Sequence, residues 1–154
     1  MEVYEEPVEF YNESGEKLVG VFHHAHNDNK WRNINMVHRL ENKMAVVVED
    51  EQMIGDVVAM ALENIGMHPV CVCKQYEDIQ SHHLTNGGLY VLDHDNKFGI
   101  NGTDFLSKNN IPKDRIILTS GKDSWQKYVD RGYDFLAKPF RIEELYTHIR
   151  GLKL

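Results

Sequence analysis

From Met44 to the C-terminus, short apolar segments alternate with segments of helical periodicity, and this alternation strongly constrains the fold. Residues 44–48 read MAVVV, an uninterrupted apolar run typical of a strand that is buried on both faces. We expect further strands at residues 69–73, 89–92, 115–118 and 133–137, and helices at residues 52–65, 76–84, 102–109, 123–131 and 142–152. Five strand–helix units predict an α/β fold, a doubly wound five-stranded parallel sheet with helices on both faces.

Residues 1–43 do not continue this alternation. VEFY and KLVGVF flank the turn sequence NESG, which predicts a β-hairpin. Residues 31–40 carry apolar side chains at helical spacing and predict a short amphipathic helix. Because this part of the chain is too short for a core of its own, we divide the protein into an N-terminal extension, residues 1–43, and a domain over residues 44–154.

Composition narrows the function. The chain has 154 residues, 42% of them hydrophobic, which suffices for a single core. Its formal net charge of -7 and lack of a basic stripe disfavour nucleic-acid binding. No apolar run approaches a membrane span, and the acidic start MEVYEEPVEF is unlike a signal peptide, so no membrane association is expected. Cys71 and Cys73 form no CxxC motif, and we interpret them as reduced thiols in or near the core of a cytoplasmic protein.

Polar side chains stand where four of the five predicted strands end. They are Glu49 and Asp50 after the first strand, Asp93 after the third, Thr119 and Ser120 after the fourth, and Lys138 after the fifth. The carboxyl ends of parallel strands share one edge of a sheet, so these groups should lie close together. Three carboxylates repel one another, and Mg²⁺, which prefers oxygen ligands, would relieve that repulsion. A lysine and a hydroxyl opposite them would hold a phosphoryl group, so the edge predicts attack by a carboxylate on a phosphoryl donor.

Four segments then resemble a known family. They read VVVEDE, YVLDHD, IILTSG and FLAKPF, and each closes a predicted strand in that order. Together they make residues 44–154, about the last seven-tenths of the chain, similar to the receiver domain of two-component response regulators. The resemblance implies a flavodoxin-like receiver fold and a single-domain response regulator. Such a protein is no enzyme beyond its own phosphorylation and autodephosphorylation, and it would receive its phosphoryl group from a sensor histidine kinase or a histidine phosphotransfer protein.

The resemblance also implies a metal site. By position, Glu49 and Asp50 would bind Mg²⁺, and Asp93 would be both a ligand and the phosphoacceptor. The backbone carbonyl of Asp95 would be a further ligand.

Other residues would handle the phosphoryl group and the switch. By resemblance, Thr119 would bind a phosphoryl oxygen and move on phosphorylation, and Phe135 would be the aromatic switch residue. Lys138 would pair first with Asp93 and then with the phosphoryl group, and the peptide before Pro139 is usually cis in this family.

The chain departs from the family pattern in two places. The loop after Asp93 reads HDNKFGING and lacks the Met-Pro pair that the family often has. The stretch between Thr119 and Lys138 is a few residues short, which should shorten the helix around residues 125–129, a surface often used for partners. We therefore expect an intact active site and an altered signalling surface. Output would pass through contact with an unidentified protein target or through phosphorelay. Residues 1–43 would dock on the receiver, form a homodimer or bind a partner.

Two alternatives stay open. One is a degenerate receiver that serves as a phosphorylation-independent binding module. The other starts from DHDNK, which also fits the DxD opening of haloacid-dehalogenase-type phosphohydrolases, with Asp95 as general acid/base. In that superfamily the acidic metal-binding pair follows the lysine, whereas here Glu49 and Asp50 precede it, which disfavours this alternative. The overlap suggests the hypothesis that Asp95 sets the lifetime of phospho-Asp93.

Histidines of the N-terminal segment offer weaker signals. His23, His24 and His26 resemble a metal cluster, but no fourth ligand stands at a typical spacing. His38 lies in MVHRLENK, which resembles the phosphoacceptor box of one class of histidine kinases. Because no ATP-binding domain accompanies it, we interpret His38 as part of a solvated helix face.

Overall fold

The computed structural model describes residues 5–11, 17–23, 39–79, 88–95, 102–121 and 126–154. Its centre is a sheet of five strands, β3 (Ala45–Val48), β4 (Val70–Cys73), β5 (Leu89–Asp93), β6 (Ile116–Ser120) and β7 (Asp134–Ala137). The strand order is β4-β3-β5-β6-β7, and every neighbouring pair is parallel. This arrangement confirms the predicted doubly wound fold, with strands beginning and ending within two residues of the expected positions.

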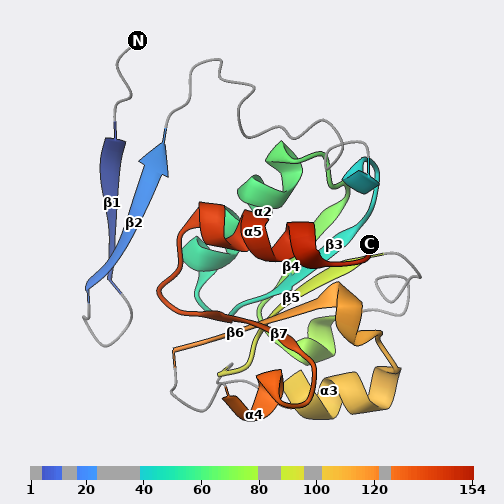
Figure 1. Ribbon diagram of the computed structural model, residues 1–154. Coiled ribbons are helices and arrows are strands. Elements are labelled where there is room, and N and C mark those ends of the chain that lie inside the picture. Colours follow the sequence, from blue (N-terminus) through green and yellow to red (C-terminus); the bar gives the residue numbers. More distant parts are fainter. Residues whose placement is uncertain (1–4, 12–16, 24–38, 80–87, 96–101, 122–125) are drawn as a thin grey trace.

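Helices cover both faces of the sheet (Figure 1). The helices are α2 (Gln52–Asn64), α3 (Gly102–Asn109), α4 (Gln126–Val129) and α5 (Ile142–Gly151), with short 3-10 helices η1 (Tyr76–Asp78) and η3 (Lys113–Arg115). Figure 1 shows α2 and α5 on one face, and α3 and α4 on the other. None of these described helices has both the length and the apolar character needed to cross a membrane.

Alternate residues of the central strands build two cores. Ala45 and Val47 of β3 belong to the cluster that includes buried side chains of α2 and α5. Val46 and Val48, which point the other way, belong to the cluster that contains Phe105 of α3 and Tyr128 of α4. A strand buried on both faces needs apolar residues at every position, which explains the unbroken runs in the sequence.

The structure corrects two helix predictions. The helix expected at residues 76–84 begins as η1, but at Ile79 the backbone is extended, with φ -72° and ψ 113°. An extended Ile79 still packs against the α3/α4-side core, so burial of its side chain does not require a helix. The helix expected at residues 123–131 ends at Val129, where the N–H of Gly132 bonds the Val129 carbonyl at 2.8 Å and Gly132 takes a φ of 81°.

The predicted hairpin is present as β1 (Glu5–Tyr11) and β2 (Lys17–His23), which pair antiparallel. Of the helix expected at residues 31–40, only Arg39 and Leu40 are described, and both are helical. Leu40 is fully buried in the core on the α2/α5 side. The predictions on His24, His26 and His38 fall outside the described residues, and the division at residue 43 stays a prediction.

Candidate functional site

The strand order brings the predicted acidic residues to one point. From β3 the chain moves to β4 on one side of it, and then crosses back to β5 on the other side. The direction of winding therefore reverses between β3 and β5. In such sheets the carboxyl ends of the strands diverge at the reversal and leave room for a ligand. Glu49 directly follows β3, and Asp93 ends β5. Local geometry thus places both carboxylates at the position where this fold binds ligands.

Glu49, Asp50 and Asp93 form a compact carboxylate cluster. One oxygen of each lies within 4.8 Å of the others. Glu49 and Asp93 are buried, with 3% and 2% of their surface exposed, and Asp50 is half-buried. The backbone N–H of Asp95 donates to the Asp93 carboxylate at 3.1 Å, so the turn after β5 also faces this cluster. The three residues predicted to bind metal through their side chains are therefore together.

Lys138 reaches into the cluster from the end of β7. Its Nζ lies 2.7 Å from Oε2 of Glu49 and 3.2 Å from Oδ1 of Asp93. Its backbone N–H bonds the Ser120 carbonyl at 2.8 Å, which fixes the base of the side chain against β6. The peptide between Lys138 and Pro139 is cis, as the resemblance implies. The predicted pairing of Lys138 with Asp93 is present, and Lys138 also bridges to Glu49.

Burial makes the charges of this cluster costly. It raises the pKa of Glu49 to about 7, with the Lys138 ammonium opposing the shift and the Asp93 carboxylate adding to it. Burial likewise raises the pKa of Asp93, against the opposing effects of Lys138 and of the Asp95 N–H. Burial lowers the pKa of Lys138, but the carboxylates of Glu49 and Asp93 outweigh burial and leave that pKa raised. The ammonium therefore stays charged, but its charge does not fully offset the effect of burial on the pKa values of Glu49 and Asp93.

The residues present fit a Mg²⁺ ion. Among the described residues, the three carboxylates face the ammonium of Lys138, and their oxygens are the hard donors that Mg²⁺ prefers. Glu49, Asp50 and Asp93 would hold the ion, and its positive charge would favour the ionised carboxylates against the burial that raises the pKa of Glu49 and of Asp93. The role of the Asp95 carbonyl stays a prediction.

The two predicted switch residues lie on neighbouring strands. Thr119 pairs in register with Asp93 across β5 and β6, and it is 2% exposed. Phe135 of β7 is half-buried, and its ring stacks on that of Tyr128, with centroids 6.5 Å apart and planes 5° from parallel. Thr119 is thus beside Asp93, the predicted phosphoacceptor, whereas Phe135 is next to α4.

The side chains of His94 and Asp95, in the turn after Asp93, contact other elements, and the sequence alone shows little sign of these contacts. The His94 ring hydrogen-bonds the Tyr128 hydroxyl of α4, with ring centroids 4.4 Å apart. The Asp95 carboxylate accepts hydrogen bonds from the Ser120 hydroxyl and from the Gly121 N–H, the latter at 3.2 Å. Asp95 therefore ties the ends of β5 and β6 together, and its influence on the lifetime of a phosphorylated Asp93 stays a prediction.

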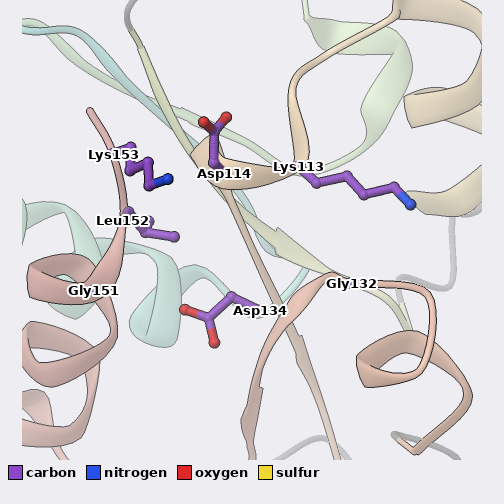
Figure 2. Close-up of a pocket in the computed structure, with 7 residues that line it drawn as sticks. All are labelled: Lys113, Asp114, Gly132, Asp134, Gly151, Leu152 and Lys153. Atoms are coloured by element: carbon purple, nitrogen blue, oxygen red, sulfur yellow. The ribbon is translucent and has the colours of Figure 1, made fainter.

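A pocket of about 430 Å³ lies elsewhere, at the amino ends of β6 and β7 (Figure 2). Lys113, Asp114, Asp134 and Lys153 are among the residues that line it. Its lysines and aspartates balance in charge, and it contains no predicted site residue. Since the carboxylate cluster lies at the carboxyl ends of the strands, the pocket belongs to the opposite edge of the sheet.

The parallel sheet, its covering helices and the carboxylate edge define a receiver-type α/β domain, and comparison with solved structures agrees. A response regulator receiver domain protein from Clostridium thermocellum superposes with a TM-score of 0.60 at 19% identity, over 70% of this chain and 91% of that one. The chemotaxis protein CheY4 of Vibrio cholerae gives 0.57 at 17% identity, over 72% and 98%. The receiver domain of a Francisella response regulator gives 0.55 at 24%, over 71% and 94%.

Sequence comparison adds nothing to this result. No family model matches the sequence, and no curated protein matches it significantly. At these low identities the structural likeness establishes the fold, which is that of response regulator receiver domains.

Proposed function

We propose that residues 44–154 form a phosphorylatable receiver that accepts a phosphoryl group on Asp93 in two-component signalling. The observation that carries this proposal is the buried cluster at the carboxyl edge of the sheet. There Glu49, Asp50 and Asp93 converge, with the Lys138 ammonium 3.2 Å from Asp93 and Thr119 beside it in register. A fold shared with receiver domains supports the same conclusion.

The chemistry is a transfer to a carboxylate. An Asp93 oxygen attacks the phosphorus of the donor, and the bond from phosphorus to the leaving group breaks, so that the leaving group departs with the electron pair. The product is an acyl phosphate. Water later attacks the same phosphorus, the bond to Asp93 breaks, and inorganic phosphate leaves the carboxylate restored. The protein acts on itself in both steps and turns over no separate substrate.

The other site residues would stabilise the transferred group. The Lys138 ammonium is held between Glu49 and Asp93, where it would pair with a phosphoryl oxygen. The Thr119 hydroxyl would donate to another oxygen and so draw β6 toward the phosphorylated Asp93. Bound Mg²⁺ would supply the positive charge that offsets the carboxylates and the incoming phosphoryl group.

Partners and location follow from the same proposal. The donor would be a sensor histidine kinase or a histidine phosphotransfer protein, and output would pass to a protein target or along a phosphorelay. Free Cys71 and Cys73 are compatible with the reducing cytoplasm in which we place the protein.

The test is intact-protein mass after incubation with acetyl phosphate, with and without Mg²⁺. We expect a single phosphoryl adduct on the wild type that requires Mg²⁺ and is absent from Asp93→Asn. Asp56→Asn, which changes an exposed aspartate on α2, serves as the matched control and should gain the adduct. A folded wild type without an adduct would favour the phosphorylation-independent binding module. Continuous release of phosphate from a phosphate monoester, offered in place of the acyl phosphate donor, would favour a dehalogenase-type phosphohydrolase.

A further inference from the structure

The peptide unit between Asp93 and His94 is held from both sides. The N–H of His94 donates to the Thr119 carbonyl of β6 at 2.8 Å. The carbonyl of Asp93 accepts the hydroxyl of Tyr76 at 2.8 Å. This peptide directly follows the proposed phosphoacceptor, so any rotation of the peptide would move the base of the Asp93 side chain.

The sheet explains why this carbonyl needs an unusual partner. In a trans peptide the C=O and N–H point in opposite directions, so when the His94 N–H faces β6, the Asp93 C=O faces β3. However, the last pair between β3 and β5 is Val48 with Leu92, and the chain then turns away toward α2. The Asp93 carbonyl therefore lacks the backbone N–H that a longer β3 would donate to it. A buried carbonyl that accepts no hydrogen bond lowers the stability of the folded protein.

Tyr76 supplies the missing donor from two strands away. It lies in η1 just after β4, and β4 and β5 flank β3 on opposite sides. Its side chain therefore reaches past the end of β3 to the end of β5. The ring is 1% exposed and packs against Phe105 of α3, with centroids 5.1 Å apart. Burial, followed by the charges of Asp93, Glu49 and Asp95, raises the pKa of the Tyr76 hydroxyl, which keeps its proton available for the bond.

We propose that Tyr76 is a positioning residue for phosphoryl transfer, which fixes the phosphoacceptor Asp93 by holding the peptide that follows it against β6. The Tyr76 hydroxyl bonds the backbone carbonyl of Asp93 and not its carboxylate, so Tyr76 would act through the Asp93 backbone. Thr119 anchors the other side of the same peptide, so the proposed phosphoryl-binding residue and Tyr76 oppose each other across it. This inference rests on the proposed function, because it assigns a role in that reaction.

The chain offers a matched control in Tyr146. Its hydroxyl also donates to a backbone carbonyl, that of Ala61 at 3.0 Å, but it joins α5 to α2 away from the carboxylate cluster. Tyr76→Phe and Tyr146→Phe each remove one hydroxyl and keep the ring. Both should therefore lower the free energy of unfolding to a similar extent. A difference between the two variants in the phosphorylation of Asp93 then reflects the position of the lost hydroxyl and not a general loss of stability.

The experiment uses the full chain and two readouts. The first is the rate of phosphorylation by acetyl phosphate at saturating Mg²⁺, followed by intact mass. The second is amide hydrogen exchange of His94, measured by NMR without Mg²⁺ or phosphodonor. We expect a roughly tenfold slower phosphorylation and a clearly faster His94 exchange for Tyr76→Phe, because small misplacements in a reacting site cost 10- to 100-fold. Tyr146→Phe should stay within about twofold of the wild type in both readouts.

The outcomes separate the two proposals. Equal phosphorylation rates for Tyr76→Phe and Tyr146→Phe would overturn the positioning role, whatever the His94 exchange shows. If the wild type accepts no phosphoryl group, the proposed function fails. In that case, the exchange rate of the His94 amide still shows whether Tyr76 holds the peptide between Asp93 and His94. An exchange rate in Tyr76→Phe equal to that of the wild type would refute this holding role too. In the wild type, the His94 amide should exchange as slowly as those of β5, a reading that needs no variant.

Discussion

At the scale of single residues, Glu49 carries a charge that the folded protein disfavours. Burial raises its pKa from 4.5 to about 7. Between these pH values the folded chain holds a proton that the unfolded chain has released. The contribution of this proton to the free energy of unfolding is fully present below about pH 4.5 and is lost as the pH rises through about 7.

We therefore expect the free energy of unfolding without Mg²⁺ to fall by roughly 1–3 kcal/mol between about pH 5 and about pH 8 through this group alone. The measurement is urea unfolding of the wild type and of Glu49→Gln, which cannot ionise, across this range. In Glu49→Gln, the free energy of unfolding should lack this part of the decrease with pH. Mg²⁺ should restore stability to the wild type at the higher pH. Identical slopes for the two proteins would show that Glu49 does not titrate in this way.

At the scale of elements, α2 lies unusually close to the edge strand β4. A Cβ placed on Gly55 of α2 would lie 2.9 Å from Cγ1 of Val72, and 3.6 Å from the Cβ of Glu49. Glycine in a helix interior costs about 1 kcal/mol relative to alanine, so its presence here reflects the close approach. That approach keeps α2 packed beside the residue that opens the carboxylate cluster.

A double-mutant cycle tests this packing. Gly55→Ala should leave stability unchanged or lower it by up to about 2 kcal/mol, because the steric overlap offsets the gain in helix propensity. In a Val72→Ala background, which removes Cγ1, the same change should stabilise by about 0.5–1 kcal/mol. Denaturant unfolding of the four proteins gives the coupling energy, and additive effects would mean that Val72 moves aside freely.

At the scale of the whole molecule, the N-terminal segment is joined to the end of the last helix. Nη1 and Nη2 of Arg39 donate to the carbonyls of Leu152 and Ile149, each at 3.1 Å. The Ile149 carbonyl also accepts the N–H of Leu152 at 3.2 Å, and the guanidinium adds a charged donor where the end of the helix carries partial negative charge. Leu40 is fully buried beside this contact, so residues preceding β3 take part in the core.

Arg39→Ala should accordingly lower the free energy of unfolding of the full chain by about 1–3 kcal/mol, since it leaves these carbonyls without a charged donor. Arg150→Ala removes an exposed arginine from the same helix end and should change it by less than about 0.5 kcal/mol. Chemical denaturation of both variants decides the matter. Equal losses would mean that Arg39 contributes no more than a surface charge.

The sequence alone determined the strands, most helices and the identity of the carboxylate edge. Apolar runs such as MAVVV specify burial on both faces, and residues that close strands must meet at one edge of a parallel sheet. Glu49, Asp93 and Lys138 could be grouped in this way because covalent order and strand direction suffice. The helix expected at residues 76–84 failed because its weak pattern did not encode the extended backbone of Ile79.

Only the tertiary structure decided how other side chains reach this edge. The contacts of Tyr76 with the Asp93 carbonyl, of His94 with Tyr128, and of Asp95 with Ser120 and Gly121 all cross between elements. No periodicity marks them, because each depends on where β3 ends, on the order of the strands and on the direction of a single side chain. The sequence supplies the charged groups of the cluster, whereas long-range packing supplies the contacts that hold them in place.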